Sequence, residues 1–119
     1  MDGDLASLDF IDKIDSTGSG LPVRLVSALE HRPGRSAEEA RSYLLSKDRQ
    51  GRRWRGGLVK LFLDGVIDTG TGWLYEPDTL GGGLKSFWPD PDDYAATVKQ
   101  YGDAGFQIAT HAIGDRAIG

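Results

Sequence analysis

Cysteine is absent from this chain of 119 residues, and methionine occurs only once. The absence of cysteine excludes disulfides and thiolate metal sites, and it leaves the redox compartment undetermined. No apolar run is long enough to span a bilayer and no signal-peptide pattern follows Met1, so we expect a cytoplasmic protein with no membrane partner. The net charge of −4 gives no general attraction to nucleic acid or to anionic membranes.

Glycine, in contrast, is abundant. It makes up 17 of the 119 residues, about twice its usual share of roughly 7%. These glycines gather between the segments with regular apolar periodicity, which indicates long, shaped loops. With 39% hydrophobic and 27% charged residues, the composition is that of an ordinary globular protein, and the length allows at most one small domain.

Helical and strand periodicities alternate along the chain. The expected helices span residues 4–15, 36 to about 51, and 91–104, and the expected strands lie near 22–29, 57–64 and 105–111. Strands that alternate with helices indicate an α/β fold with a parallel sheet of about three strands. Three strands are too few to bury both faces of such a sheet comfortably, so we expect the chain to be a piece of a larger domain.

The last of these strands ends on a histidine. Alternation along the strand places Gln107, Ala109 and His111 on one face. The C-terminal end of a strand, just before a turn into a helix, is where α/β folds keep their chemistry. His111 is therefore a candidate functional residue. The alternative is a histidine that is merely hydrogen-bonded in a turn.

Lys60 lies in the middle of the apolar strand 57–64. Alternation groups it with Phe62 and Asp64 on one face of that strand. Since a buried ammonium group without a partner is costly, three interpretations stay open. The lysine has a functional role, extends to water, or pairs with Asp64.

Residues 65–90 form a connection that is unusually long for a compact domain. Its aromatic residues favour a packed lid over a site rather than a linker. They are Trp73, Tyr75, Phe87 and Trp88.

A basic cluster precedes the strand that carries Lys60. It consists of Arg49, Arg52, Arg53 and Arg55. In a chain of negative net charge, such a cluster near a helix end favours a solvated surface and a partner for the helix dipole. We therefore expect no nucleic-acid partner.

Three segments together resemble the middle of a known family. The strings Val59–Gly65, Glu76–Pro77 and Gly105–Ala117 are similar to amidohydrolase family 3, the group that includes N-substituted formamide deformylase-like enzymes. Within them, His111–Ala117 is long and specific. The resemblance implies a (β/α)8 barrel with a metal site at the C-terminal ends of its strands. Residues 1–119 would form the central part of that barrel, incomplete at both ends.

The resemblance also implies a site. Lys60 corresponds to the fourth-strand lysine, which in such enzymes is often carboxylated by CO2 and bridges two metals, and His111 corresponds to the fifth-strand ligand. One or two divalent ions, zinc by preference, would activate a water that hydrolyses a carbon–nitrogen bond in a small amide-like substrate. Asp64 and Asp115 would lie behind the ligands or beside the substrate. Asp115 could instead cap the following helix.

The chain lacks other parts of the family pattern, namely a His-x-His pair, a sixth-strand histidine and an eighth-strand aspartate. His31 is the only other histidine, and it has no partner at ligand spacing. Because two ligands do not complete a catalytic zinc centre, we expect the chain alone to be inactive. Two alternatives remain. One is a stand-alone module that binds an anion at the Gly114 helix N-terminus with Lys60 as countercharge, and the other is an inactive barrel relative. The substrate and the oligomeric state are not predicted.

Overall fold

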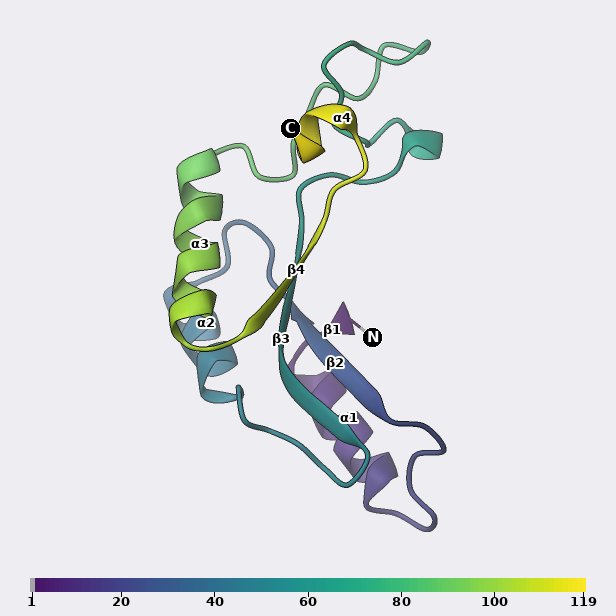
Figure 1. Cartoon of the computed structure of the whole chain (residues 1–119), viewed down its shortest axis with the longest axis vertical. Coiled ribbons are helices and arrows are strands. Elements are labelled where there is room, and N and C mark those ends of the chain that lie inside the picture. Colours follow the sequence, from purple (N-terminus) through teal and green to yellow (C-terminus); the bar gives the residue numbers. More distant parts are fainter. Residues whose placement is uncertain (1) are drawn as a thin grey trace.

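The computed structural model describes residues 2–119 and shows an α/β chain built on one parallel sheet (Figure 1). The elements, in order, are β1 (Asp2–Gly3), α1 (Leu5–Asp15), β2 (Leu25–Glu30), α2 (Ala37–Leu45), β3 (Trp54–Phe62), the 3-10 helix η1 (Ile67–Thr69), α3 (Pro91–Asp103), β4 (Gln107–His111) and α4 (Asp115–Ile118). No helix within residues 2–119 is long and apolar enough to cross a membrane.

The four strands lie side by side in sequence order, β1-β2-β3-β4, and each neighbouring pair is parallel. The predicted α/β class and the three predicted strands are confirmed. The additional strand, β1, has only two residues, which is too short to show a period in the sequence.

The helices pack on one face of the sheet. Leu8 and Ile11 of α1, Tyr43 of α2 and Tyr101 of α3 form one buried cluster with strand residues that include Val59. Amphipathic spacing explains this arrangement, because residues three or four apart share one side of a helix. The three helices predicted from sequence periodicity therefore form, and each buries one side against the sheet.

The opposite face of the sheet is only partly covered. Val26 is 38% exposed, Lys60 and Phe62 are half-buried, and Gln107 is exposed. The radius of gyration is 16.5 Å, whereas about 13.5 Å is typical of a compact domain of this length. The chain is thus an elongated layer with one sheet face left largely open.

Several element ends differ from the prediction. β3 begins at Trp54 rather than residue 57, because the Trp54 ring belongs to the core and is 4% exposed. It ends at Phe62 rather than residue 64, because Asp64 leaves the sheet to bind backbone amides. α2 ends at Leu45 rather than near residue 51, since the Ser46 hydroxyl donates to the Tyr43 carbonyl at 2.6 Å and stops the helix. The other two strands span Leu25–Glu30 and Gln107–His111 instead of 22–29 and 105–111.

The arginine cluster ties the segment after α1 to the start of β3. Arg52 donates to the Ser19 carbonyl at 3.1 Å, and Arg53 donates to the Leu21 carbonyl at 2.7 Å. Arg49 forms an ion pair with Asp9 of α1 at 2.8 Å. These contacts give three of the four arginines a structural role.

Candidate functional site

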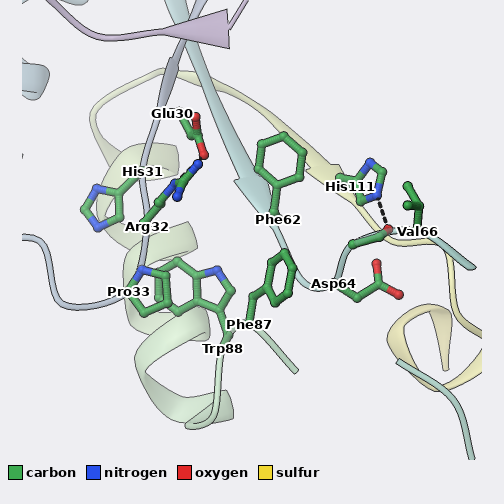
Figure 2. Close-up of a pocket in the computed structure, with 11 residues that line it drawn as sticks. Glu30, His31, Arg32, Pro33, Phe62, Asp64, Val66, Phe87, Trp88 and His111 are labelled. Atoms are coloured by element: carbon green, nitrogen blue, oxygen red, sulfur yellow. Dashed lines mark hydrogen bonds and ion pairs between the residues drawn. The ribbon is translucent and has the colours of Figure 1, made fainter. Parts of the chain in front are cut away.

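A cavity of about 670 Å³ opens at the C-terminal ends of β2, β3 and β4 (Figure 2). Parallel strands bring their carboxyl ends to one edge of the sheet, which is where α/β folds bind ligands. The walls come from the end of β2 and the residues after it (30–33), from the end of β3 and the residues after it (62 and 64–66), from Phe87 and Trp88 of the long connection, and from His111 of β4. The structure therefore places His111 at a cavity, as its position at a strand end suggests.

One ring nitrogen of His111 is fixed by the backbone. Nε2 lies 2.7 Å from the Gly65 carbonyl oxygen, and because a carbonyl only accepts, Nε2 must carry the proton. In the neutral ring the lone pair then lies on Nδ1, for which residues 2–119 provide no hydrogen-bond partner. This is the arrangement of metal-binding histidines, in which one N–H is held by a carbonyl and the other nitrogen is oriented to bind. The ring is hydrogen-bonded, as the simpler interpretation expected, and one nitrogen is still available.

Lys60 lies on the same sheet face, deeper than the cavity. It is half-buried, its Nζ lies 5.2 Å from the centre of the Phe62 ring, and it does not line the cavity. In the sheet register Lys60 is opposite Ala109, two residues before His111. Strand spacing and rise put the Cα atoms of Lys60 and His111 about 8 Å apart, a separation that a lysine side chain can bridge.

The suggested pairing of Lys60 with Asp64 is wrong. None of the ion pairs in the described part of the chain involves Lys60. The Asp64 carboxylate is 0% exposed and accepts three backbone N–H groups instead. A carboxylate that accepts several backbone amides is already satisfied without a cation.

Asp64 joins the two segments that follow β3 and β4. Its Oδ2 accepts from Trp73 N and from Gly114 N, each at 2.7 Å, and its Oδ1 accepts from Ile113 N at 3.0 Å. It thereby fixes the turn just after His111, while the next residue, Gly65, holds the His111 ring.

This carboxylate also occupies the proposed anion site. The amides of Ile113 and Gly114 at the start of α4 already donate to Asp64. The helix itself has four residues, so its dipole is small. The anion at this helix N-terminus is therefore one of the chain's own side chains, and the structure does not favour the anion-binding alternative.

Asp115 is not the cap of α4. Gly114 is the N-cap residue and Asp115 is the first helical residue. Its Oδ1 accepts from Tyr75 N at 3.1 Å and from Arg116 N at 2.8 Å, in an exposed position away from the cavity. A Cβ at position 114 would lie 1.9 Å from the Trp73 carbonyl oxygen, so only glycine fits where the chain turns into α4.

His31 was missed as a residue of the cavity, whereas Trp88 belongs to the connection predicted to cover a site. The Tyr101 hydroxyl lies 2.7 Å from His31 Nδ1, and burial raises the pKa of Tyr101 to about 12, so this hydroxyl keeps its proton and donates it. Burial, with Arg35 nearby, lowers the pKa of His31. His31 is thus a neutral ring that stacks on Trp88 at 6.1 Å. The sequence did carry a signal for His31. It directly follows β2, and His111 has a similar position at the end of β4.

The pair Glu30 and Arg32 was also missed. Arg32 Nε lies 2.6 Å from Glu30 Oε1, and both residues line the cavity. Glu30 is opposite Lys60 in the sheet register, on the face that carries the candidate ligands. Two opposite charges two residues apart are common on surfaces, so the sequence carried no signal that they lie at a site.

The described residues fit part of a metal site. His111 offers Nδ1, and Lys60 becomes a ligand only after carboxylation replaces its positive ammonium with an anionic oxygen group. Across residues 2–119 there is no group of three or more His, Cys, Asp or Glu side chains that could hold a metal ion. A catalytic centre needs at least three protein ligands, so Lys60 and His111 can supply two of them.

The parallel sheet with helices on one face and a cavity at its strand ends is a fold segment shared with metal-dependent hydrolases. No family model matches the chain. Two solved structures are similar to it, uncharacterized metal-dependent hydrolases from Pyrococcus furiosus and from Pyrococcus horikoshii OT3. Both have a TM-score of 0.63 over 96% of this chain, with 25% and 22% sequence identity, respectively.

A curated relative is similar in sequence over a shorter region. The exoenzymes regulatory protein AepA of Pectobacterium carotovorum subsp. carotovorum is 40% identical over 63 residues, which is 50% of this chain. The chain spans 13% of AepA and 23% and 22% of the two hydrolases. The two solved structures thus support a hydrolase-like fold for a region that is less than a quarter of either of them.

Proposed function

We propose that this chain is the central part of the (β/α)8 barrel of an amidohydrolase family 3 enzyme, which hydrolyses carbon–nitrogen bonds in small amide-like molecules. The observation that carries this proposal is the His111 ring at the cavity, with Nε2–H bound to the Gly65 carbonyl and Nδ1 available. The sequential parallel strands and the single helical layer support it, because each is a property of a barrel segment.

In the proposed enzyme, Lys60 in its carboxylated form and His111 hold one or two divalent ions, with zinc as the expected metal. Such an ion lowers the pKa of water to near neutrality and polarises the carbonyl group of the substrate. The remaining ligands come from residues outside this chain.

The chain's own residues orient and shield this site. Asp64 fixes the turn after His111, and the Gly65 carbonyl fixes the ring. Phe62 and Phe87 line the cavity with apolar surface, which excludes water and strengthens electrostatic interactions with the substrate.

The test uses the full-length protein that contains this chain. After chelation and addition of Zn²⁺, the hydrolysis of formanilide and acetanilide is measured for the wild type, Lys60→Ala and His111→Ala. We expect both variants to lose at least about a hundredfold in kcat/KM, as removal of a catalytic group does. Lys99→Ala, which removes an exposed lysine paired with Asp103, is the matched control and should keep full activity.

Turnover that is unchanged in Lys60→Ala or His111→Ala would overturn the proposal. A folded wild-type protein that binds no Zn²⁺ and hydrolyses neither anilide would instead favour the inactive barrel relative.

A further inference from the structure

We infer that the indole N–H of Trp88 is a substrate-binding donor, which selects a neutral oxygen acceptor on an apolar group of the substrate. The inference rests on the proposed function only for the identity of the substrate's reacting end, at His111. The binding site itself follows from the shape and the lining residues of the cavity.

The cavity has two distinct ends. Figure 2 shows His111 on one side of Phe62 and Trp88 on the other, with Phe87 between Trp88 and the end of β3. A molecule whose reacting group lies at His111 therefore extends along Phe62 toward Trp88. The groups it meets on the way are aromatic, which favours a flat apolar substituent.

Trp88 has an unsatisfied polar group at this end. The residue is 3% exposed, and its Nε1 has no hydrogen-bond partner within residues 2–119. In Figure 2 the indole nitrogen faces the side where Phe62 and Phe87 lie. By comparison, Trp54 Nε1 donates to Asp12 Oδ1 at 3.1 Å. Since a buried indole N–H normally finds an acceptor, the acceptor for Trp88 is expected to come from a ligand.

The Trp88 ring is held in a fixed orientation. Its backbone N–H donates to Ser86 Oγ at 3.0 Å, and Ser86 Oγ donates to the Leu63 carbonyl at 3.1 Å, which ties the Trp88 backbone to the segment just after β3. On the other side the ring stacks on His31 and meets the Tyr94 ring edge-on at 5.6 Å. The ring therefore keeps its orientation when a ligand binds, while the side chains that cover the buried Nε1 shift to admit the acceptor.

The charges around the cavity decide which acceptor fits. Of the described residues that line it, Arg32 is the one with a guanidinium group, and this group is paired with Glu30 and 76% exposed. A substrate carboxylate at the Trp88 end would meet the Glu30 carboxylate and no guanidinium other than the paired Arg32, whereas a ketone, ester or amide oxygen needs only the Trp88 donor.

The experiment compares three benzamides with the same ring and different para groups. 4-Acetylbenzamide carries a neutral acceptor, 4-isopropylbenzamide has the same shape without it, and 4-carboxybenzamide carries an anion. Calorimetric titration into full-length protein should give an affinity for the acetyl compound that is roughly three- to tenfold higher than for the other two, the effect of one hydrogen bond. Trp88→Phe should abolish the difference between the acetyl and isopropyl compounds. The matched variant Trp73→Phe, which changes a tryptophan of the same loop outside this cavity, should keep it.

A direct spectroscopic readout in the wild type covers the case in which Trp88→Phe does not fold. Indole N–H signals are recorded in a ¹H–¹⁵N spectrum of full-length protein labelled at tryptophan, to which this chain contributes three, and Trp73→Phe and Trp54→Phe identify the other two. The Trp88 signal should move downfield with 4-acetylbenzamide and not with 4-isopropylbenzamide. Equal affinities for the three compounds, tightest binding of the carboxylate, or an unmoved Trp88 signal would each overturn the inference. Acceptor-dependent binding without hydrolysis would retain it and refute the proposed function.

Discussion

The Asp64 carboxylate should contribute more to stability than any other acid whose contacts are described above. Asp64→Ala leaves three backbone amides without an acceptor, the buried Gly114 N and the partly buried Trp73 N and Ile113 N. Each unsatisfied buried donor costs about 1–3 kcal/mol, and water entering from the cavity relieves part of this cost. We therefore expect the low end of the sum, a loss of about 3–5 kcal/mol in the free energy of unfolding.

Urea denaturation of the wild type and the variant measures this loss. With a slope of about 2 kcal/mol per M urea, the midpoint should fall by roughly 1.5–2.5 M. Asp115→Ala is the matched control, because its carboxylate also accepts two backbone amides but lies on the surface, where water replaces it. Asp115→Ala should lower the free energy of unfolding by less than about 1 kcal/mol. Equal midpoints for the two variants would refute the view that Asp64 holds the site together.

Two further predictions concern residues around the cavity. Because burial and Arg35 lower the pKa of His31, the unfolded chain binds this proton more readily than the folded one. The contribution of His31 to the free energy of unfolding should be complete above pH 6.5 and should decrease as the pH falls below that value. Urea midpoints from pH 8 to 5 should show this fall in the wild type and a smaller fall in His31→Phe. The same pH dependence in both proteins would contradict it. Gly114→Ala should lower the thermal midpoint strongly, because the new Cβ meets the Trp73 carbonyl at 1.9 Å. Gly102→Ala in α3, whose Cβ meets nothing nearer than 4.0 Å, should leave the midpoint unchanged or raised, and an equal effect of both substitutions would exclude the steric explanation.

The layers of the fold could be predicted because they depend on local patterns. The period of Leu8 and Ile11 predicts the buried face of α1, and the apolar run around Val59 predicts the central strand. Parallel strands then place His111 at the edge of the sheet where the cavity lies. Each of these steps uses only the periodicity of one segment or the geometry of one sheet.

The contacts that complete the site could not be predicted, because they join distant segments. Asp64 accepts from Trp73 and Gly114, which lie 9 and 50 residues away. The partner of His31 is Tyr101, 70 residues along the chain. In a single sequence no local pattern distinguishes these partners from other aromatic or polar residues.

The long connection shows the same limit. Its aromatic content predicts a packed lid, and Phe87 and Trp88 do line the cavity. Trp73 and Tyr75 instead lie beside Arg116, whose guanidinium is 5.0 Å and 5.9 Å from their rings. Composition identified a packed loop, but which aromatic residues face the cavity depends on the hydrogen bonds that Asp64 and Asp115 make to that loop.

The proposed binding of a metal ion by His111 and Lys60 is tested most directly by measuring how much metal the protein holds. Full-length protein is purified without chelators, and its bound divalent metal is measured per chain for the wild type, His111→Ala, Lys60→Ala and His31→Ala. His31→Ala is the control, since its ring is bound to Tyr101 and offers no ligand. We expect one or two ions in the wild type and the control, and a loss of at least one ion in each of the other two variants. Full metal content in His111→Ala or Lys60→Ala would contradict it.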